Sequence, residues 1–234
     1  MKRHLSLFTV LLCGFQVAFG QKDSALIKAD YNQHTILKGL IIDLGTAYIP
    51  EHSYMNTPGF FDVRTGRPST VNIYMHKNIS IFGHYLSVSP GLGLGLDNYY
   101  FKNDLIIAPA GDSLFSISEE GLRKSKLSAN YVDIPLELRF ASGPNYKKAF
   151  KIAVGGKFGV LFSGNSKIKY DQDGSAVIRK FSDQSLNRIR YGLTGRVAYG
   201  HFGVFAYYSL SSVFKAKYGP ELNPFIFGVT ISSF

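Results

Sequence analysis

The chain has 234 residues, with 26 Lys or Arg against 16 Asp or Glu, a formal net charge of +10, and a single cysteine. One cysteine excludes a disulfide framework and a thiolate metal site. After the first 20 residues no apolar run approaches the roughly 18 residues of a membrane-spanning helix, so the chain either stays out of membranes or crosses one as strands.

Residues 1–20 have the pattern of a cleaved secretory signal peptide. Lys2 and Arg3 are followed by an apolar stretch and by the small-x-small site Ala18-Phe19-Gly20. Cys13 follows Leu12 rather than a small residue, so a lipid anchor is not expected. Removal of the signal leaves 24 basic and 16 acidic residues, a charge of +8. We expect residues 21–37 to be a short periplasmic lead-in and residues 38–234 to form one domain.

Apolar and polar side chains begin to alternate at residue 38. Residues 38–48 form the first expected strand, with Asp43 on its polar face, and residues 49–69 form a long loop rich in Pro, Gly, His and Asn. Residues 70–82 form the second strand, which meets the third across Gly83-His84 in a two-residue turn that pairs Phe82 with Tyr85. Lys77 would then lie on the apolar face, and a bulge near residues 76–78 is expected to turn it inward.

The strand over residues 87–100 has two unlike faces. Leucines at 92, 94 and 96 alternate with glycines at 91, 93 and 95, so one face is apolar and the other nearly bare. Such a strand suits the wall of a small closed barrel with lipid outside and little room inside. Residues 101–125 follow as a second long loop.

The fourth and fifth expected strands, residues 131–140 and 150–162, join across a short turn at residues 142–145. Two registers remain open. One sets Arg139 opposite Lys151 and Asp133 opposite Lys157, and the other sets Glu137 opposite Lys151. Either register brings an acid close to a base.

The last third of the chain repeats this arrangement. Residues 163–186 form a third long loop, in which residues 167–170 and 176–180 are expected to pair as a hairpin above the barrel. A strand over 188–199 turns at Gly200-His201 into a strand over 202–208, with Tyr199 paired to Phe202. A fourth loop over 211–223 leads to a final strand over 225–234, in which Phe234 is out of step with the apolar face. Either a bulge near Ser232-Ser233 or an end outside the ladder would explain this.

Eight strands, with short turns after the even ones and long loops after the odd ones, predict an all-β fold. It is an eight-stranded antiparallel up-and-down transmembrane β-barrel in the outer membrane, with both termini in the periplasm and the long loops outside. Aromatic girdles are expected at both rims. The outer girdle comprises Tyr48, Tyr99, Tyr100, Tyr131 and Phe162, and the inner girdle Tyr85, Phe140, Phe150, Tyr199 and Phe202.

The polar faces carry mixed charges, including Asp97 and Arg188, and an eight-stranded barrel has room only for packed side chains. The expected site is therefore an ion-pair network that plugs the lumen, made of Asp43, Asp133, Glu137, Arg139, Lys151, Lys157, Arg190 and Arg196. Two alternatives remain: a narrow gated pore through the same residues, and a secreted barrel whose faces are inverted around an apolar ligand.

No cofactor, metal or catalytic site is expected. The histidines are scattered, the glycine run lacks the G-x-G-x-x-G spacing, and Asp171-Gln172-Asp173-Gly174 lacks the first and last ligands of a calcium loop. A lipid-acting barrel enzyme is an alternative from another class, and His52 next to Ser53 is its candidate pair. Nucleic acid is not an expected partner, because the basic residues do not interleave with aromatic ones on one face.

Two stretches carry a family resemblance: Ser87-Val88-Ser89-Pro90-Gly91-Leu92-Gly93-Leu94-Gly95, and residues 131–140 with Ile134-Pro135-Leu136. Here the chain resembles the PorT-like outer-membrane β-barrel proteins of Bacteroidota, over about residues 38–234. The resemblance implies a barrel without a cofactor, and some members are accessory parts of the type IX secretion machinery. We therefore expect a monomeric, non-enzymatic outer-membrane protein that contacts lipids, including lipopolysaccharide, and other envelope or secretion proteins through its long loops.

Overall fold

The computed structural model describes residues 39–49, 69–83, 85–100, 108–110, 113–115, 122–143, 148–172, 175–182, 185–216 and 221–232. The expected signal peptide and lead-in lie outside these ranges. Within them, no helix is both long and apolar enough to cross a membrane. The strands are β1 Leu40–Tyr48, β2 Thr70–His76, β3 Ile79–Phe82, β4 Leu86–Tyr100, β5 Ala108–Ala110, β6 Ser113–Phe115, β7 Leu122–Ala141, β8 Phe150–Gln172, β9 Ser175–Ser182, β10 Ile189–Tyr199, β11 Phe202–Ser209 and β12 Phe225–Ser232.

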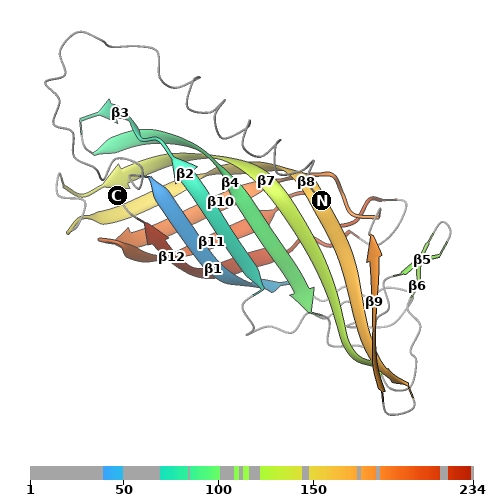
Figure 1. The fold of residues 1–234 in the computed structure, drawn as a ribbon. Coiled ribbons are helices and arrows are strands. Elements are labelled where there is room, and N and C mark those ends of the chain that lie inside the picture. The colour runs from blue at the N-terminus through green and yellow to red at the C-terminus, as the bar shows by residue number, and fades with distance from the viewer. Residues whose placement is uncertain are drawn as a thin grey trace, which may run out of the picture. The chain divides into compact units, whose positions relative to one another are not determined.

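Eight of these strands close into a barrel, as predicted (Figure 1). The hydrogen-bonded order runs β10, β11, β12, β1, β2, β4, β7 and β8, and β8 pairs back to β10. All neighbours are antiparallel, and the first and last strands meet from Ile41 opposite Ser232 to Tyr48 opposite Phe225. We call the end with the β3–β4, β7–β8 and β10–β11 connections the short-turn end, and the opposite end the long-connection end.

The pairing registers make this barrel narrow. A path from Leu86 on β4 that follows paired residues once around the wall returns to β4 at Leu96, ten residues further along (96 − 86). With eight strands, this stagger corresponds to a strand tilt of about 40° and an interior just wide enough for side chains. Whatever points inward must therefore pack against the opposite wall.

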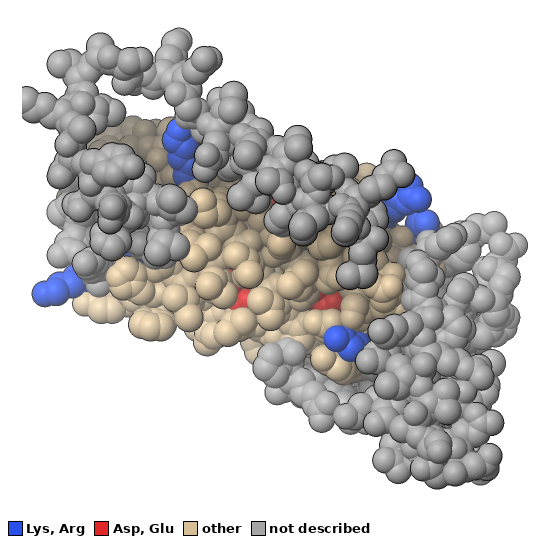
Figure 2. All heavy atoms as spheres, in the orientation of Figure 1, with Lys and Arg blue, Asp and Glu red and all other residues tan. Residues whose placement is uncertain are grey.

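The two faces of the wall differ sharply in exposure. Leu136 and Leu193 on the outer face are 55% and 58% exposed, whereas Asp43 on the inner face is 1% exposed. In Figure 2 the middle of the described surface is mostly tan, and Lys and Arg side chains lie toward its ends. Apolar side chains thus point outward and charged ones inward, so the inverted barrel with an apolar ligand inside is wrong.

The turn between β3 and β4 differs from the prediction. Phe82 pairs with Leu86 instead of Tyr85, after a register shift between Ser80 and Phe82, and the Tyr85 amide donates to the Phe82 carbonyl over 3.1 Å. Gly83 has a φ of 54°, a left-handed conformation that favours glycine. At the β10–β11 turn, the predicted pairing of Tyr199 with Phe202 is confirmed.

The bulge expected at Lys77 is also absent. His76 pairs with Gly91 and Ile79 with Val88 in one continuous register, and the Lys77 amide donates to the Pro90 carbonyl over 2.9 Å. Lys77 therefore stays exposed on the outer face. It lies one residue beyond His76, whose amide bonds to Gly39 just before β1 begins. At this rim a lysine can extend its ammonium group into water, so no bulge is needed.

Strands β7 and β8 are longer than their apolar alternation indicates. β7 begins at Leu122 rather than residue 131, and β8 continues to Gln172 rather than residue 162. Beyond Val160, where the β8–β10 ladder ends, β8 pairs instead with β9, and Lys167 lies opposite Lys180. This confirms the predicted hairpin above the barrel. The extension was missed because a strand in water needs no apolar face.

The girdles are confirmed in part. Phe140, Phe150, Tyr199 and Phe202 are exposed at the short-turn end, and Tyr48 and Phe162 are exposed at the long-connection end. Tyr99 and Tyr131, expected in the outer girdle, are each 4% exposed and point into the lumen. Both have odd residue numbers, and in β4 and β7 the even-numbered side chains point outward. The alternation therefore places Tyr99 and Tyr131 inside. In β12, the ladder is regular to Ser232, without a bulge, and Phe234 lies outside the described residues.

Candidate functional site

One group of charged side chains fills the lumen toward the long-connection end. We call Asp97, Asp133, Lys157 and Arg190, from β4, β7, β8 and β10, the Arg190 cluster. Arg190 donates to both oxygens of Asp133, over 2.9 Å from Nε and 2.5 Å from Nη2, and also forms an ion pair with Asp97. The Lys157 Nζ lies 3.7 Å from Asp133 Oδ2. Two acids and two bases meet here, so the cluster is neutral.

A second group lies closer to the short-turn end. The Arg196 cluster comprises Asp43, Glu137, Arg139 and Arg196, from β1, β7 and β10. Arg196 bonds to Asp43 over 2.9 Å and lies 3.3 Å from Glu137, which also accepts from Arg139 Nη2 over 2.7 Å. This cluster is neutral too. Burial of a charge is tolerated only when its partner is buried with it, and the matched numbers meet that condition.

Tyrosines contact the Arg190 cluster and shield its two cations. Tyr74 donates to Asp133 over 3.0 Å and accepts from Lys157 over 3.1 Å. The Lys157 Nζ lies 3.8 Å from the centre of the Tyr207 ring, and the Arg190 guanidinium carbon lies 4.0 Å from that of Tyr131. Aromatic faces attract cations at these distances. Parity places Tyr74 on β2 and Tyr207 on β11 inside the barrel, but the expected network contains only charged residues.

Seven of the eight expected network residues lie in the two clusters. Lys151 lies apart at the short-turn mouth, where it is half-buried and its Nζ donates to the Gly200 carbonyl over 2.8 Å. Asp97 is the cluster acid missing from the expected set, and Arg188 lies exposed, just before β10. Both expected registers of β7 and β8 are wrong, because Lys151 faces Ala141 and Lys157 faces Pro135. The ion pairs form diagonally and across the lumen, which strand-by-strand pairing does not reveal.

The inward glycines provide the space for these side chains. A Cβ atom at Gly95 or at Gly159 would meet Arg190 and Asp133, and one at Gly91 would lie 3.0 Å from the His76 ring. The bare face of β4 is therefore the wall against which the network packs.

Alanine at Gly95 is expected to destabilise the barrel by about 1–3 kcal/mol, because its methyl group would push the Arg190 guanidinium out of its ion pairs. Alanine at Gly195 is the matched control. A Cβ there would meet nothing within 4 Å, so the change should stay within about 0.5 kcal/mol. Urea unfolding of the two variants in the same detergent measures the difference. Equal urea midpoints for the two variants would show that the ion-pair network does not depend on the glycine-lined inner face of β4.

An apolar cap closes the long-connection end. Leu186, Val213, Phe214 and Leu222 come from the connections that border β10, β11 and β12, and each is at most 7% exposed. They pack with inward strand residues that include Leu127, Tyr99, Tyr131 and Tyr207. The Val213 amide donates to the Leu222 carbonyl over 2.9 Å, and Leu186 and Phe214 form an isolated antiparallel β-bridge. Residues 163–186 and 211–223 were expected as outer loops, but these parts of them turn into the lumen.

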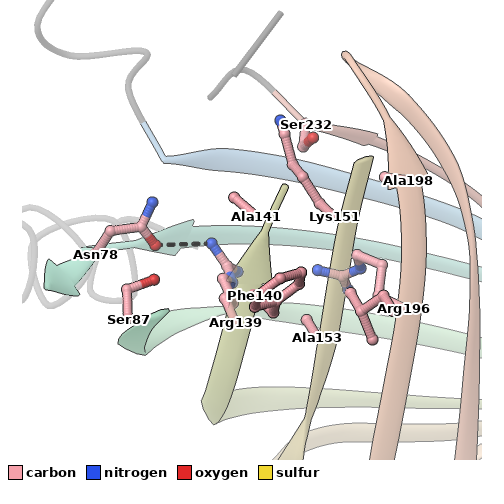
Figure 3. A pocket seen from close by; sticks show the side chains of 11 residues that line it. Asn78, Ser87, Arg139, Phe140, Ala141, Lys151, Ala153, Arg196, Ala198 and Ser232 are labelled. Carbon is pink, nitrogen blue, oxygen red and sulfur yellow. Dashed lines mark hydrogen bonds between the residues drawn. The ribbon is translucent and has the colours of Figure 1, made fainter. Parts of the chain in front are cut away.

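Three cavities found along the described lumen measure about 30, 10 and 10 Å³. The largest lies at the short-turn mouth (Figure 3). By this measure one water needs roughly 10–15 Å³, so the largest space admits about two waters, each of the others about one, and none a drug-sized ligand. Within the described ranges no three His, Cys, Asp or Glu side chains gather as metal ligands. His52 and Ser53 lie outside those ranges.

Comparison with known proteins gives a family match and similar solved structures. A family model described as "Outer membrane protein beta-barrel domain" matches residues 64–215. Among solved structures, Ail, the attachment invasion locus protein of Yersinia pestis, aligns with 12% identity and a TM-score of 0.36 over 83% of this chain and 98% of that one. Its complex with the heparin analogue sucrose octasulfate aligns with 13% identity and a TM-score of 0.34, over 82% and 95%. No curated protein matches.

Proposed function

The chain belongs to the outer membrane protein beta-barrel domain family, and from this membership we propose that it is a sealed outer-membrane barrel with a structural or interaction role. The observation that carries the proposal is the lumen, which two neutral clusters fill and an apolar cap covers. A filled lumen offers neither a path for ions nor a chamber for a substrate. We therefore expect other molecules to contact the protein at the outside of the barrel.

The proposed orientation places the short-turn end in the periplasm and the long-connection end outside the cell. Barrels of the bacterial outer membrane have short periplasmic turns and longer outer connections. Residues 1–20 then act as the cleaved signal and residues 21–37 as the periplasmic lead-in. Because the barrel is closed and its outer face apolar, a monomer surrounded by lipid is the proposed state.

The proposed contact element is the sheet that extends beyond the barrel. β7 and β8 remain paired beyond the level of Val160, and β9 pairs with this extension of β8. β9 is the last strand in the order, with one edge paired to β8. Such an edge offers backbone groups to a partner. The proposed partners are outer-membrane lipids, including lipopolysaccharide, and envelope or secretion proteins. We propose no enzymatic activity for this chain. The PorT-like resemblance supports an accessory role in secretion, although its motifs lie in wall strands.

Deletion of the β8–β9 hairpin tests this role. Residues 166–181 would be replaced by Asn-Gly, which joins Asn165 to Ser182, residues already paired with each other. The variant should still reach the outer membrane and keep a heat-dependent shift in gel mobility, because the ladder that closes the barrel ends at Val160. The wild type should migrate on a native gel of host membranes as a complex larger than the bare barrel, and the variant as the barrel alone.

A labelling control checks folding and orientation. Cysteine at Ser175, where β9 begins, should react with a membrane-impermeant maleimide in intact cells. Cysteine at Ser142, at the short-turn end, should react only in opened cells. A wild type that migrates as the bare barrel, or a deletion that leaves the complex unchanged, would contradict the proposed role.

A further inference from the structure

We propose that one face of the sheet beyond the barrel binds the phosphate groups of lipopolysaccharide in the outer leaflet. Strands β7 and β8 stay paired beyond the barrel, and β9 lies beside the far end of β8 (Figure 1). Five lysine positions share one face of this sheet, which we call the lysine face: Lys124, Lys126, Lys167, Lys169 and Lys180. The proposal rests on the orientation and the contact role proposed above, and it names a partner for that same element.

The pairing register brings these lysines together. One row of paired positions runs from Lys126 on β7 through Lys167 on β8 to Lys180 on β9. Lys124 lies opposite Lys169, two residues further along both strands. Residues that pair directly share a face of an antiparallel sheet, as do residues two apart on one strand, so all five positions belong to one face. Like charges directly opposite each other destabilise a sheet, and a bound anion would offset this cost.

The lysine face carries little opposing charge. Among the paired positions that the structure describes on this face of β7, β8 and β9, alternation adds one acid, Asp171, close to the hairpin tip. Five lysines and one aspartate leave a charge of +4 (5 − 1). A surface of this charge attracts an anionic partner.

The lysine face continues the lipid-facing wall of the barrel. Tyr100 pairs with Lys126, whose Nζ lies 5.5 Å from the centre of the Tyr100 ring. Three kinds of paired outer position follow one another along β7 and β8: apolar Val132 and Val160, neutral polar Ser128 and Asn165, and basic Lys126 and Lys167. Because both strands run from the wall into the lysine face, a lipid that packs against the wall has its headgroup beside these lysines. This continuity favours a lipid over a soluble polyanion.

The height of the lysine face selects the kind of phosphate. Phe162, which is exposed on the outer face of β8, lies five residues before Lys167 (167 − 162). With a rise of about 3.3 Å per residue and a tilt of about 40°, Lys167 lies about 13 Å farther from the middle of the membrane than Phe162. The headgroup layer of a phospholipid bilayer is about 5–8 Å thick on each side, so its phosphates lie below this level. Lipopolysaccharide carries phosphates on sugars that extend farther out, and it therefore fits this height.

Titration of the folded protein in a neutral detergent with lipopolysaccharide from the host tests the proposal. A dye on a cysteine at Ser142, at the short-turn end, reports binding by thermophoresis. The triple lysine variant, Lys126→Gln with Lys167→Gln and Lys180→Gln, should bind about a hundredfold more weakly, because each lysine near an anionic surface contributes roughly a factor of five. The heat-dependent gel shift checks that the variant is folded.

A variant with the same loss of charge is the matched control. Lys77→Gln with Lys148→Gln and Arg188→Gln removes three basic side chains from exposed positions outside the lysine face and should bind as the wild type does. Urea unfolding gives a second readout. Without lipid the triple lysine variant should be at least as stable as the wild type, because like-charged pairs are removed. Lipopolysaccharide should raise the urea midpoint of the wild type and leave that of the triple lysine variant unchanged.

Three other ligands represent the alternative partners. They are dephosphorylated lipopolysaccharide, phosphatidylglycerol in mixed micelles, and dextran sulfate, a soluble polyanion. Each should bind at least tenfold more weakly than intact lipopolysaccharide. Equally tight binding of any of the three, or equal affinities of the triple lysine variant and its control, would overturn the proposal. This titration scores a lipid on the purified protein, whereas the hairpin deletion scores a complex in host membranes, so the two proposals fail separately.

Discussion

Replacement of Arg190 by methionine is expected to lower the free energy of unfolding by about 3–5 kcal/mol, the largest loss for a single side chain of the lumen. Arg190 is the shared partner of two buried carboxylates, Asp97 and Asp133, each at most 1% exposed. Methionine fills much of the same volume but leaves both negative charges in a narrow interior, with Lys157 as the remaining cation of the cluster. Urea unfolding, followed by the heat-dependent gel shift, measures the loss.

Two further variants separate charge from packing. Arg188→Gln changes an exposed arginine two residues away and should shift stability by no more than about 0.5 kcal/mol. Adding Asp97→Asn to Arg190→Met leaves Asp133 with Lys157 as its partner, so the cluster is neutral again and most of the loss should be restored. If the double variant is as unstable as Arg190→Met alone, lost packing rather than charge balance accounts for the effect.

An arginine in place of Leu193 is expected to destabilise the barrel in lipid by about 2–4 kcal/mol, because it would put a charge near the middle of the bilayer. Leu193 lies near the centre of β10 on the outer face and is 58% exposed. In a soluble barrel, an arginine at so exposed a site would be harmless. Folding into lipid vesicles at increasing urea, scored by the folded gel band, measures the cost.

Phe202→Arg is the matched control for this substitution. Phe202 is 70% exposed on the same outer face but begins β11 directly after the turn, at the short-turn rim. There the charge reaches the interface, and the expected cost falls to about 0–1 kcal/mol. Equal costs at the two sites would mean that the apolar band does not face lipid.

Sequence periodicity located the wall strands because each has one face toward lipid and one toward the lumen. β10 occupies almost the expected residues, and the inward positions of Asp43 and Asp133 follow from parity alone. Outside the bilayer this contrast is lost, so residues 122–125 of β7 and the end of β8 are expected as loops, and residues 126–130 are assigned to no element. The hairpin of β8 with β9 was still found, since alternation returns on both sides of Asp173-Gly174.

The contacts within the lumen were less predictable. Parity gives the face of a residue but not the register between strands, and a two-residue shift preserves every face. Arg190 therefore had no assignable partner, although Asp97 and Asp133 were known to point inward. The cap was missed for another reason. Val213 and Phe214 stand in a loop without periodicity, and their burial depends on the shape of the barrel mouth.

The pairing of β1 with β12 also gives an order to assembly. Ile41 and Ser232 are partners almost a whole chain apart, so their ladder carries the greatest loop-closure entropy and is expected to form late. Asp43 meets Arg196, 153 residues away, only once strands from both ends of the chain are in place, whereas Arg139 and Glu137 are two residues apart. Before closure Asp43 is a charge without its base, and afterwards it is half of an ion pair. Joining the two ends of the sheet thus also completes the electrostatics of the lumen, which favours the closed ring over an open, partly folded sheet.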